Sequence, residues 1–355
     1  MTKPLRFALA GTGFWSRYQL HGWRELPGCE CAALYNRTRS KAETLAREFG
    51  IPAVYDDYEA LLAAEQLDFV DLVTGVEQHA SMARLAADRG LAVVCQKPIA
   101  PDLATATAMV NHAGAKGTPL LINENWRWQT QIRAFAAALK TAPLGRIWRA
   151  RIDYANSFPV FTNQPFLREL DQFILTDIGT HILDVLRFLF GEAETVHAHT
   201  HRVARGIKGE DAATALFRMR SGLTVTANMS YASRVPVERF PETLILVEGE
   251  DASLTLDLDF RIHLVTREGT TTTRHAPPSY GWADPRYAVV HASIVAAQRN
   301  LLDGLRGAAP AETTARDNLE TLRLVFACYE SARSQRIVQM SDFIQAFPLP
   351  GGTMQ

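Results

Sequence analysis

Apolar and polar positions follow two alternating patterns in the first third of the chain. Short apolar runs are separated by stretches with helical spacing, such as SKAETLAREFG and EQHASMARLAADRG. These runs cover residues 5–10, 29–35, 69–74, 91–95 and 119–122. Strands that alternate with helices are typical of a parallel sheet with helices on both faces. The pattern predicts an α/β domain over residues 1–124.

The pattern changes after residue 124. Helical spacing appears over residues 129–140 and 175–190, and it returns over residues 285–305 and 313–333. Between these helices, strand-like segments follow one another directly from residue 195 to residue 266. Consecutive strands without intervening helices favour an antiparallel sheet. We therefore predict a second, α+β domain over residues 125–355 with a large, mostly antiparallel sheet.

Composition narrows the possible partners. A chain of 355 residues favours two domains. Its 37 basic and 38 acidic residues leave no basic excess for binding nucleic acid or an anionic membrane. Four cysteines are too few for a disulfide framework, and neither a signal segment nor a membrane-length apolar run stands out. We expect a cytoplasmic protein that acts on a small molecule.

The first predicted strand ends in a glycine-rich turn, AGTGFWS, in which Ser16 stands where a third glycine or alanine is usual. Glycines let the backbone approach a pyrophosphate, and the amides that open the next helix bind its charge. A plain turn is the alternative, but the position after a first strand favours a dinucleotide. The predicted cofactor contacts of this turn are Gly11, Thr12, Gly13, Phe14 and Trp15.

The second predicted strand ends in LYNRTRSK, which lacks the carboxylate that would hold an adenosine ribose. Asn36 and Arg37 stand there instead. A guanidinium at this place favours the 2′-phosphate of NADP, although NAD stays possible and a solvated helix start is the alternative. We predict that both residues contact the cofactor.

Two further stretches carry ionisable side chains. In VVCQKPIA, Lys97 ends an apolar strand, at the edge of a parallel sheet where ligands gather. In LTDIGTHILDVLRFLFG, Asp177 and His181 are four residues apart, on one face of a predicted helix. A carboxylate beside an imidazole supports general acid or base chemistry. Taken singly, the lysine also fits a surface position and the Asp–His pair a surface ion pair.

Considered together, the glycine turn, QKP and DIGTH resemble the glucose-fructose oxidoreductase, inositol dehydrogenase and MocA family, whose signatures are a glycine fingerprint, E-K-P and D-x-G-x-H. The likeness spans most of the chain in the right order. It implies a Rossmann domain followed by a domain with a large open sheet, and catalytic residues that meet at the cleft between them. Carried over, these are Lys97, Asp177 and His181, which also bind substrate. The resemblance implies that the histidine exchanges a proton with substrate, the lysine assists and the aspartate positions.

The resemblance extends to three neighbouring segments, with departures. Gln96 replaces the family's usual glutamate, and TGVEQHA keeps the threonine and histidine of T-P-x-x-x-H while losing the proline. NENWRWQ is similar to the family's N-x-R-[FWY] segment. The implied cofactor contacts are Thr74, His79, Gln96, Lys97 and Asn125, and the further implied substrate contact is Arg127. Trp126 and Trp128 are either part of this site or packing residues.

The three alternating histidines of HAHTH, at positions 197, 199 and 201, have no acidic or cysteine partner spaced with them, so we predict no metal site. The leading functional hypothesis is an oxidoreductase that transfers hydride between a nicotinamide cofactor, NADP favoured, and a sugar, cyclitol, related polyol or keto-sugar. The alternative is a redox-neutral glycosidase or isomerase of the same superfamily, and a non-catalytic nucleotide sensor comes third. Family members commonly pair through the open sheet, which implies a homodimer or homotetramer.

Overall fold

The structure is a computed structural model that describes residues 3–345. These residues form two compact units. One contains the residues up to Glu124 together with Ile294–Glu320, and the other contains Asn125–Ser293 and the described residues from Thr321 onward. The predicted second domain, residues 125–355, differs from this division in Ile294–Glu320. Within the first unit, hydrogen bonds from Gln298 to Gln19 and from Thr313 to Ile122 hold this segment.

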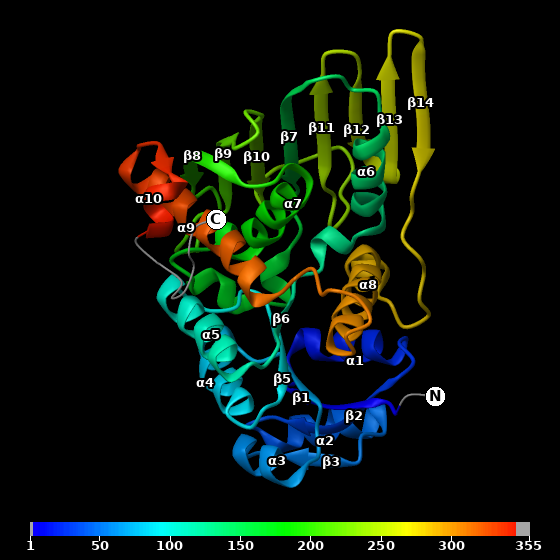
Figure 1. Ribbon diagram of the computed structural model, residues 1–355, viewed down its shortest axis with the longest axis vertical. Coiled ribbons are helices and arrows are strands. Elements are labelled where there is room, and N and C mark those ends of the chain that lie inside the picture. The colour runs from blue at the N-terminus through cyan, green and yellow to red at the C-terminus, as the bar shows by residue number, and fades with distance from the viewer. Residues whose placement is uncertain (1–2, 346–355) are drawn as a thin grey trace. The chain divides into compact units, whose positions relative to one another are not determined.

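The first unit is built on a six-stranded parallel sheet with the order β3-β2-β1-β4-β5-β6 (Figure 1). The strands are β1 (Leu5–Ala10), β2 (Cys29–Tyr35), β3 (Ala53–Tyr55), β4 (Phe69–Leu72), β5 (Ala92–Gln96) and β6 (Leu120–Asn123). The connecting helices are α1 (Phe14–Arg24), α2 (Arg39–Phe49), α3 (Tyr58–Ala64), α4 (Val76–Ala87) and α5 (Leu103–Lys116). The strand order reverses between β1 and β4, which is the switch point where such sheets bind nucleotides. The predicted Rossmann fold is confirmed.

The second unit is built on a nine-stranded sheet with the order β14-β13-β12-β11-β7-β10-β9-β8-β15. Among the described strands of this sheet, only the β7–β10 pair is parallel, so the predicted mostly antiparallel sheet is confirmed. Its strands are β7 (Ile147–Ala155), β8 (Ala193–His201), β9 (Ala212–Met219), β10 (Thr224–Ser230), β11 (Leu244–Gly249), β12 (Ser253–Asp257), β13 (Arg261–Thr266), β14 (Gly269–Arg274) and β15 (Val338–Gln339).

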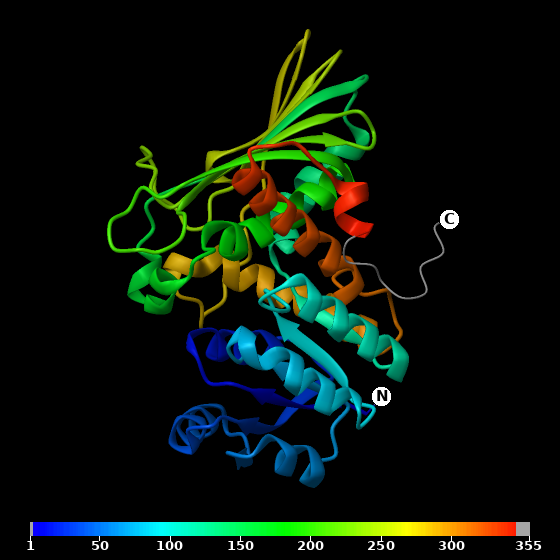
Figure 2. The same ribbon diagram turned by 90° about the vertical axis from the view of Figure 1, so that its left-hand side faces the viewer.

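Helices pack on one face of this nine-stranded sheet, and Figures 1 and 2 show α7 lying along it. From Ala213 to Met219, the side chains of β9 alternate between buried and exposed, because one face forms the core and the other faces solvent. The helices after residue 124 are α6 (Thr130–Thr141), α7 (Thr180–Phe190), α8 (Ala288–Leu305), α9 (Ala315–Ser334) and α10 (Met340–Gln345), and the residues of α8 and α9 are divided between the two units. Within residues 3–345, no helix is both long and apolar enough to cross a membrane.

Candidate active site

The glycine turn after β1 has the backbone geometry of a dinucleotide loop. Gly11 has φ +105°, in the region that favours glycine, and a Cβ atom there would lie 2.5 Å from the carbonyl oxygen of Val73. Its N–H donates to the carbonyl of Tyr35 at 2.8 Å, which ties the turn to the end of β2. Gly13 is the N-cap residue of α1, and in the part of the chain that the structure describes this cap makes no side-chain hydrogen bond to the helix amides. The turn therefore leaves backbone donors for an anion.

Polar groups around this turn fit a nicotinamide dinucleotide. The hydroxyls of Thr12 and Ser16 are buried and have no hydrogen-bond partner among the described residues. Buried hydroxyls without a partner are costly, so a bound phosphate or ribose would satisfy them. Phe14 and Trp15 open α1 with their rings 5.0 Å apart. The five predicted contacts of the turn thus lie together, and their contact with cofactor stays a prediction.

The end of β2 presents a basic side chain. Asn36 donates from its side-chain amide to the carbonyl of Thr38 at 2.9 Å, so this amide shapes the turn before α2. Arg37 is exposed, and within residues 3–345 it forms no ion pair. A guanidinium in this setting is available to an anionic ligand. The predicted contact of Arg37 with a 2′-phosphate is not tested by this geometry.

His79 joins the loops that follow β4 and β5. Its ring is almost fully buried on α4; Nε2 lies 3.2 Å from the carbonyl oxygen of Thr74, and Nδ1 lies 3.2 Å from that of Pro98. Burial lowers the pKa of His79, which disfavours the charged imidazole, and a neutral ring can donate to only one of these carbonyls. The ring of His79 thus contacts the loops after β4 and β5, while direct contact of Thr74 or His79 with cofactor stays a prediction.

Gln96 and Lys97 lie where β5 ends. The Gln96 side-chain nitrogen is buried and has no hydrogen-bond partner in the described part of the chain. Lys97 is half-buried, and the Lys97–Pro98 peptide is cis. The two residues therefore stand at the carboxyl edge of the Rossmann sheet, on the side that holds the second nucleotide of a dinucleotide.

In the second unit, the predicted helix over residues 175–190 is interrupted at its start. Residues Leu175–Gly179 form a π-helical turn, and the α-helix begins only at Thr180. The simple four-residue spacing predicted for Asp177 and His181 therefore does not describe this turn. π-Turns are frequent at functional sites. Asp177 lies in the turn, and its Oδ2 accepts a hydrogen bond from the Tyr231 hydroxyl at 3.0 Å.

His181 is buried near the start of α7, against an aromatic ring. The indole of Trp126 stacks on the imidazole, with centroids 4.0 Å apart and planes inclined by 20°. Trp126 is itself fixed by a 3.2 Å hydrogen bond from Nε1 to the hydroxyl of Thr243. Trp126, which the sequence left undecided between site and packing, thus packs directly on a predicted catalytic side chain.

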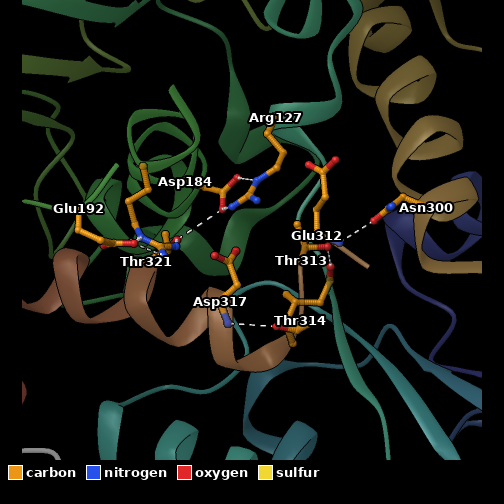
Figure 3. A network of polar contacts seen from close by, with 11 residues as sticks. Arg127, Asp184, Glu192, Asn300, Glu312, Thr313, Thr314, Asp317 and Thr321 are labelled. Carbon is orange, nitrogen blue, oxygen red and sulfur yellow. Dashed lines mark hydrogen bonds and ion pairs between the residues drawn. The ribbon is translucent and has the colours of Figure 1, made fainter. Parts of the chain in front are cut away.

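Arg127 forms a buried ion pair with α7. Its Nε and Nη2 donate to the two carboxylate oxygens of Asp184 at 2.7 and 2.5 Å, and Figure 3 shows the guanidinium facing that carboxylate. The hydroxyl of Thr321 accepts from Arg187 and donates to Asp184, at 2.8 and 3.4 Å. Two donors of Arg127 are thus engaged within the protein, and its predicted contact with substrate is untested. Asp184 was missed, although a carboxylate inside an apolar helix signals a buried partner.

Asn125 anchors the same segment. Its side-chain amide donates to the hydroxyl of Ser293 at 2.7 Å, within α8. Asn125, Trp126 and Arg127 are consecutive, and each binds a different partner inside this unit. Hydrogen bonds thus hold all three side chains of the segment, and the predicted contact of Asn125 with cofactor stays a prediction.

The three alternating histidines, at positions 197, 199 and 201, lie on β8. The rings of His197 and His199 are 4.9 Å apart on β8. Across residues 3–345, no group of three or more histidine, cysteine or acidic side chains is placed to hold a metal ion.

A glycine turn on a Rossmann sheet, a lysine at the end of β5, an aspartate in the π-turn and a histidine near the start of α7 are the features expected of a nicotinamide-dependent oxidoreductase. Two family models match the chain. Residues 5–124 match "Oxidoreductase family, NAD-binding Rossmann fold", and residues 132–255 match "GFO/IDH/MocA C-terminal domain". The chain belongs to the Gfo/Idh/MocA family of oxidoreductases, and the predicted family is confirmed.

Relatives are similar over nearly the whole chain. A D-apiose dehydrogenase of Paraburkholderia graminis is 43% identical over 340 residues, which cover 96% of this chain and 91% of the relative. A D-apiose dehydrogenase of Rhizobium rhizogenes is 37% identical, over 96% and 99%. The solved structure of an Agrobacterium radiobacter oxidoreductase with NAD+, L-tartaric acid and magnesium is 36% identical, with a TM-score of 0.93 over 96% of this chain and 99% of that one.

Proposed function

We propose that this protein is an NAD(P)-dependent dehydrogenase that transfers hydride between the cofactor and a sugar or related polyol, with D-apiose as the first substrate to test. The observation that carries the proposal is the end-to-end similarity to two D-apiose dehydrogenases, which includes both units. The Rossmann turn, with its unpartnered buried hydroxyls, supports a nicotinamide dinucleotide as the cofactor.

Each proposed catalytic side chain has one task. A bound nicotinamide would supply the hydride acceptor or donor. His181 exchanges the proton of the reacting hydroxyl or carbonyl, and its stacking on Trp126 limits the orientations of the ring. Lys97 assists that proton transfer, and Asp177 orients the reacting groups through its carboxylate. Proton transfer must accompany hydride transfer, because oxidation of an alcohol releases both.

The alternative is a redox-neutral glycosidase or isomerase of the same superfamily, in which the cofactor is reduced and reoxidised within one turnover. Incubating the protein with D-apiose, other sugars and inositols, with each cofactor in turn, separates the two. We expect reduced nicotinamide to accumulate in the near ultraviolet in step with product. Product without accumulated reduced cofactor would establish the alternative.

For the cofactor we propose a preference for NADP, supported by the exposed Arg37 and by the absence of a carboxylate after β2. The NAD+ in the Agrobacterium radiobacter structure is the observation that favours NAD. If Arg37 binds a 2′-phosphate, Arg37→Ala should weaken NADP binding by about 10- to 100-fold and leave NAD binding almost unchanged. Fluorescence titrations of both cofactors test this, with Arg47→Ala, an exposed arginine on α2, as the control. Equal losses for both cofactors would contradict the phosphate contact.

We propose that the protein assembles through the exposed face of the nine-stranded sheet as a homodimer or homotetramer. The solvent-facing side of β8 and β9 supports this proposal. Leu216 is exposed there, beside polar residues such as His197 and Thr214, and an exposed apolar side chain on a broad sheet face favours association. A cytoplasmic location also remains a proposal, and four unpaired cysteines fit it.

A further inference from the structure

The carboxylate of Asp177 accepts a hydrogen bond from the hydroxyl of Tyr231, a residue that belongs to none of the sequence motifs described above. The Tyr231 hydroxyl lies 3.0 Å from Oδ2 of Asp177, although the two residues are 54 positions apart in the chain. Tyr231 directly follows β10, whereas Asp177 belongs to the π-turn before α7. A hydrogen bond from a hydroxyl to an ionised carboxylate is charge-assisted and stronger than one between neutral groups.

The ring of Tyr231 is fixed by its neighbours. It lies parallel to the ring of Phe173, with centroids 5.7 Å apart and planes inclined by 7°. The ring of Tyr154 stands almost perpendicular to it at 5.7 Å, and the backbone N–H of Tyr231 donates to the carbonyl of Asp211 at 2.9 Å. This packing keeps the hydroxyl directed at Asp177.

The phenol also remains a donor. Burial, and then the charge of the neighbouring Asp177, raise the pKa of Tyr231 well above the usual value for tyrosine. The hydroxyl thus stays protonated over the working range of pH, so Tyr231 does not itself exchange protons with substrate.

We propose that Tyr231 is a positioning residue for the reaction, whose hydroxyl holds the carboxylate of Asp177 in the orientation that proton transfer requires. This role rests on the proposed function of Asp177. It adds Tyr231, the residue directly after β10, to the predicted catalytic residues of the second unit. In this account the π-turn orients the carboxylate of Asp177 toward the Tyr231 hydroxyl.

A double-mutant cycle in the full-length protein tests the proposal. Tyr231→Phe removes only the hydroxyl, and we expect kcat to fall by about 10- to 100-fold while KM and cofactor affinity change by less than about threefold. In an Asp177→Asn background, the same substitution should change kcat by less than about twofold: the amide oxygen can still accept the hydrogen bond, but the carboxylate whose orientation matters for proton transfer is gone. Tyr58→Phe is the matched control: it deletes a buried hydroxyl that donates to the Met82 carbonyl, and it should lower only the melting temperature.

Two results would overturn the inference while leaving the dehydrogenase intact. One is a Tyr231→Phe enzyme with nearly normal kcat, whatever its melting temperature. The other is an equal loss of kcat in the wild-type and Asp177→Asn backgrounds, which would mean that Tyr231 acts independently of Asp177. Failure of the proposed function looks different: the wild-type protein would reduce neither cofactor with any sugar, or Asp177→Asn would retain full kcat and remove the basis of this inference too.

Discussion

Lys97 and His181 occupy unlike surroundings, since Lys97 is half-buried at the end of β5 and His181 lies buried against Trp126. If both take part in proton transfer, Lys97→Ala and His181→Ala should each lower kcat by about 100-fold or more and leave NADP(H) binding nearly intact. Steady-state kinetics and cofactor titration measure both effects. Lys140→Ala, at the exposed end of α6, serves as the control. Near-normal rates in both variants would contradict the assignment.

We expect Asp71 to lower the free energy of unfolding as the pH rises, which is the opposite of what a carboxylate in an ion pair does. This carboxyl is fully buried on β4 and accepts from the Trp23 indole at 2.7 Å, and burial raises its pKa to about 7. The folded state therefore binds a proton more tightly than the unfolded chain, so this group's contribution to stability is lost as pH rises from about 4 to about 7.

Replacing Asp71 with asparagine should remove that loss. Asp71→Asn keeps an acceptor for Trp23 and cannot ionise, so we expect it to be more stable than the wild type by roughly 2–4 kcal/mol above pH 7. The difference should shrink steadily as the pH falls toward about 4. Urea unfolding of both proteins across this range measures it, and a difference independent of pH would mean that Asp71 does not titrate there.

At the level of single residues, short sequence motifs identified the candidate catalytic residues, but the sequence did not reveal which side chains these residues would contact. The positions of Lys97, Asp177 and His181 followed from short sequence patterns. Tyr231 and Asp184 did not, because their partners are 54 and 57 residues away in the chain and only tertiary packing brings them together. Whether the predicted residues contact cofactor and substrate depends on ligands, which a sequence pattern does not contain.

At the level of elements, the Arg127–Asp184 ion pair joins the short helix η1 (Trp126–Trp128) to α7, and its contribution to the free energy of unfolding can be measured. Removing one partner of a buried ion pair leaves an uncompensated charge, so Arg127→Met should lower the free energy of unfolding by about 3–5 kcal/mol. Replacing both partners, as Arg127→Met with Asp184→Leu, should restore at least about half of that loss. Denaturant unfolding of the two single variants and the double variant decides the point. A double variant whose losses simply add would contradict a direct pair.

The regular elements were predictable because hydrophobic periodicity reports burial. The parallel strands β1, β2, β4, β5 and β6 and the strands after residue 195 appear as expected, whereas β3 and β7 were not predicted. The π-turn at Leu175–Gly179 was not predictable, since one extra residue in a helical turn leaves the apolar stripe of α7 almost unchanged. The assignment of Ile294–Glu320 to the first unit also escaped prediction, because it depends on distant partners such as Gln19.

For the whole molecule, the exposed face of the nine-stranded sheet leads to a prediction about assembly. Leu216 on β9 and Val265 on β13 are 46% and 41% exposed on a sheet whose other face forms the core. A broad exposed face that contains apolar side chains favours association between copies. We expect a dimer or tetramer at micromolar concentration in light scattering. A monomer at that concentration would contradict assembly through this sheet.

The central claim is that hydride moves between a sugar carbon and the nicotinamide. The most direct measurement uses D-apiose, or another sugar found to be a substrate, labelled with deuterium at the carbon that is oxidised, followed by mass spectrometry of the cofactor. The account predicts that reduced nicotinamide carries the deuterium in step with product. Product formed while the cofactor stays oxidised, or reduced cofactor without the label, would contradict direct hydride transfer by this protein.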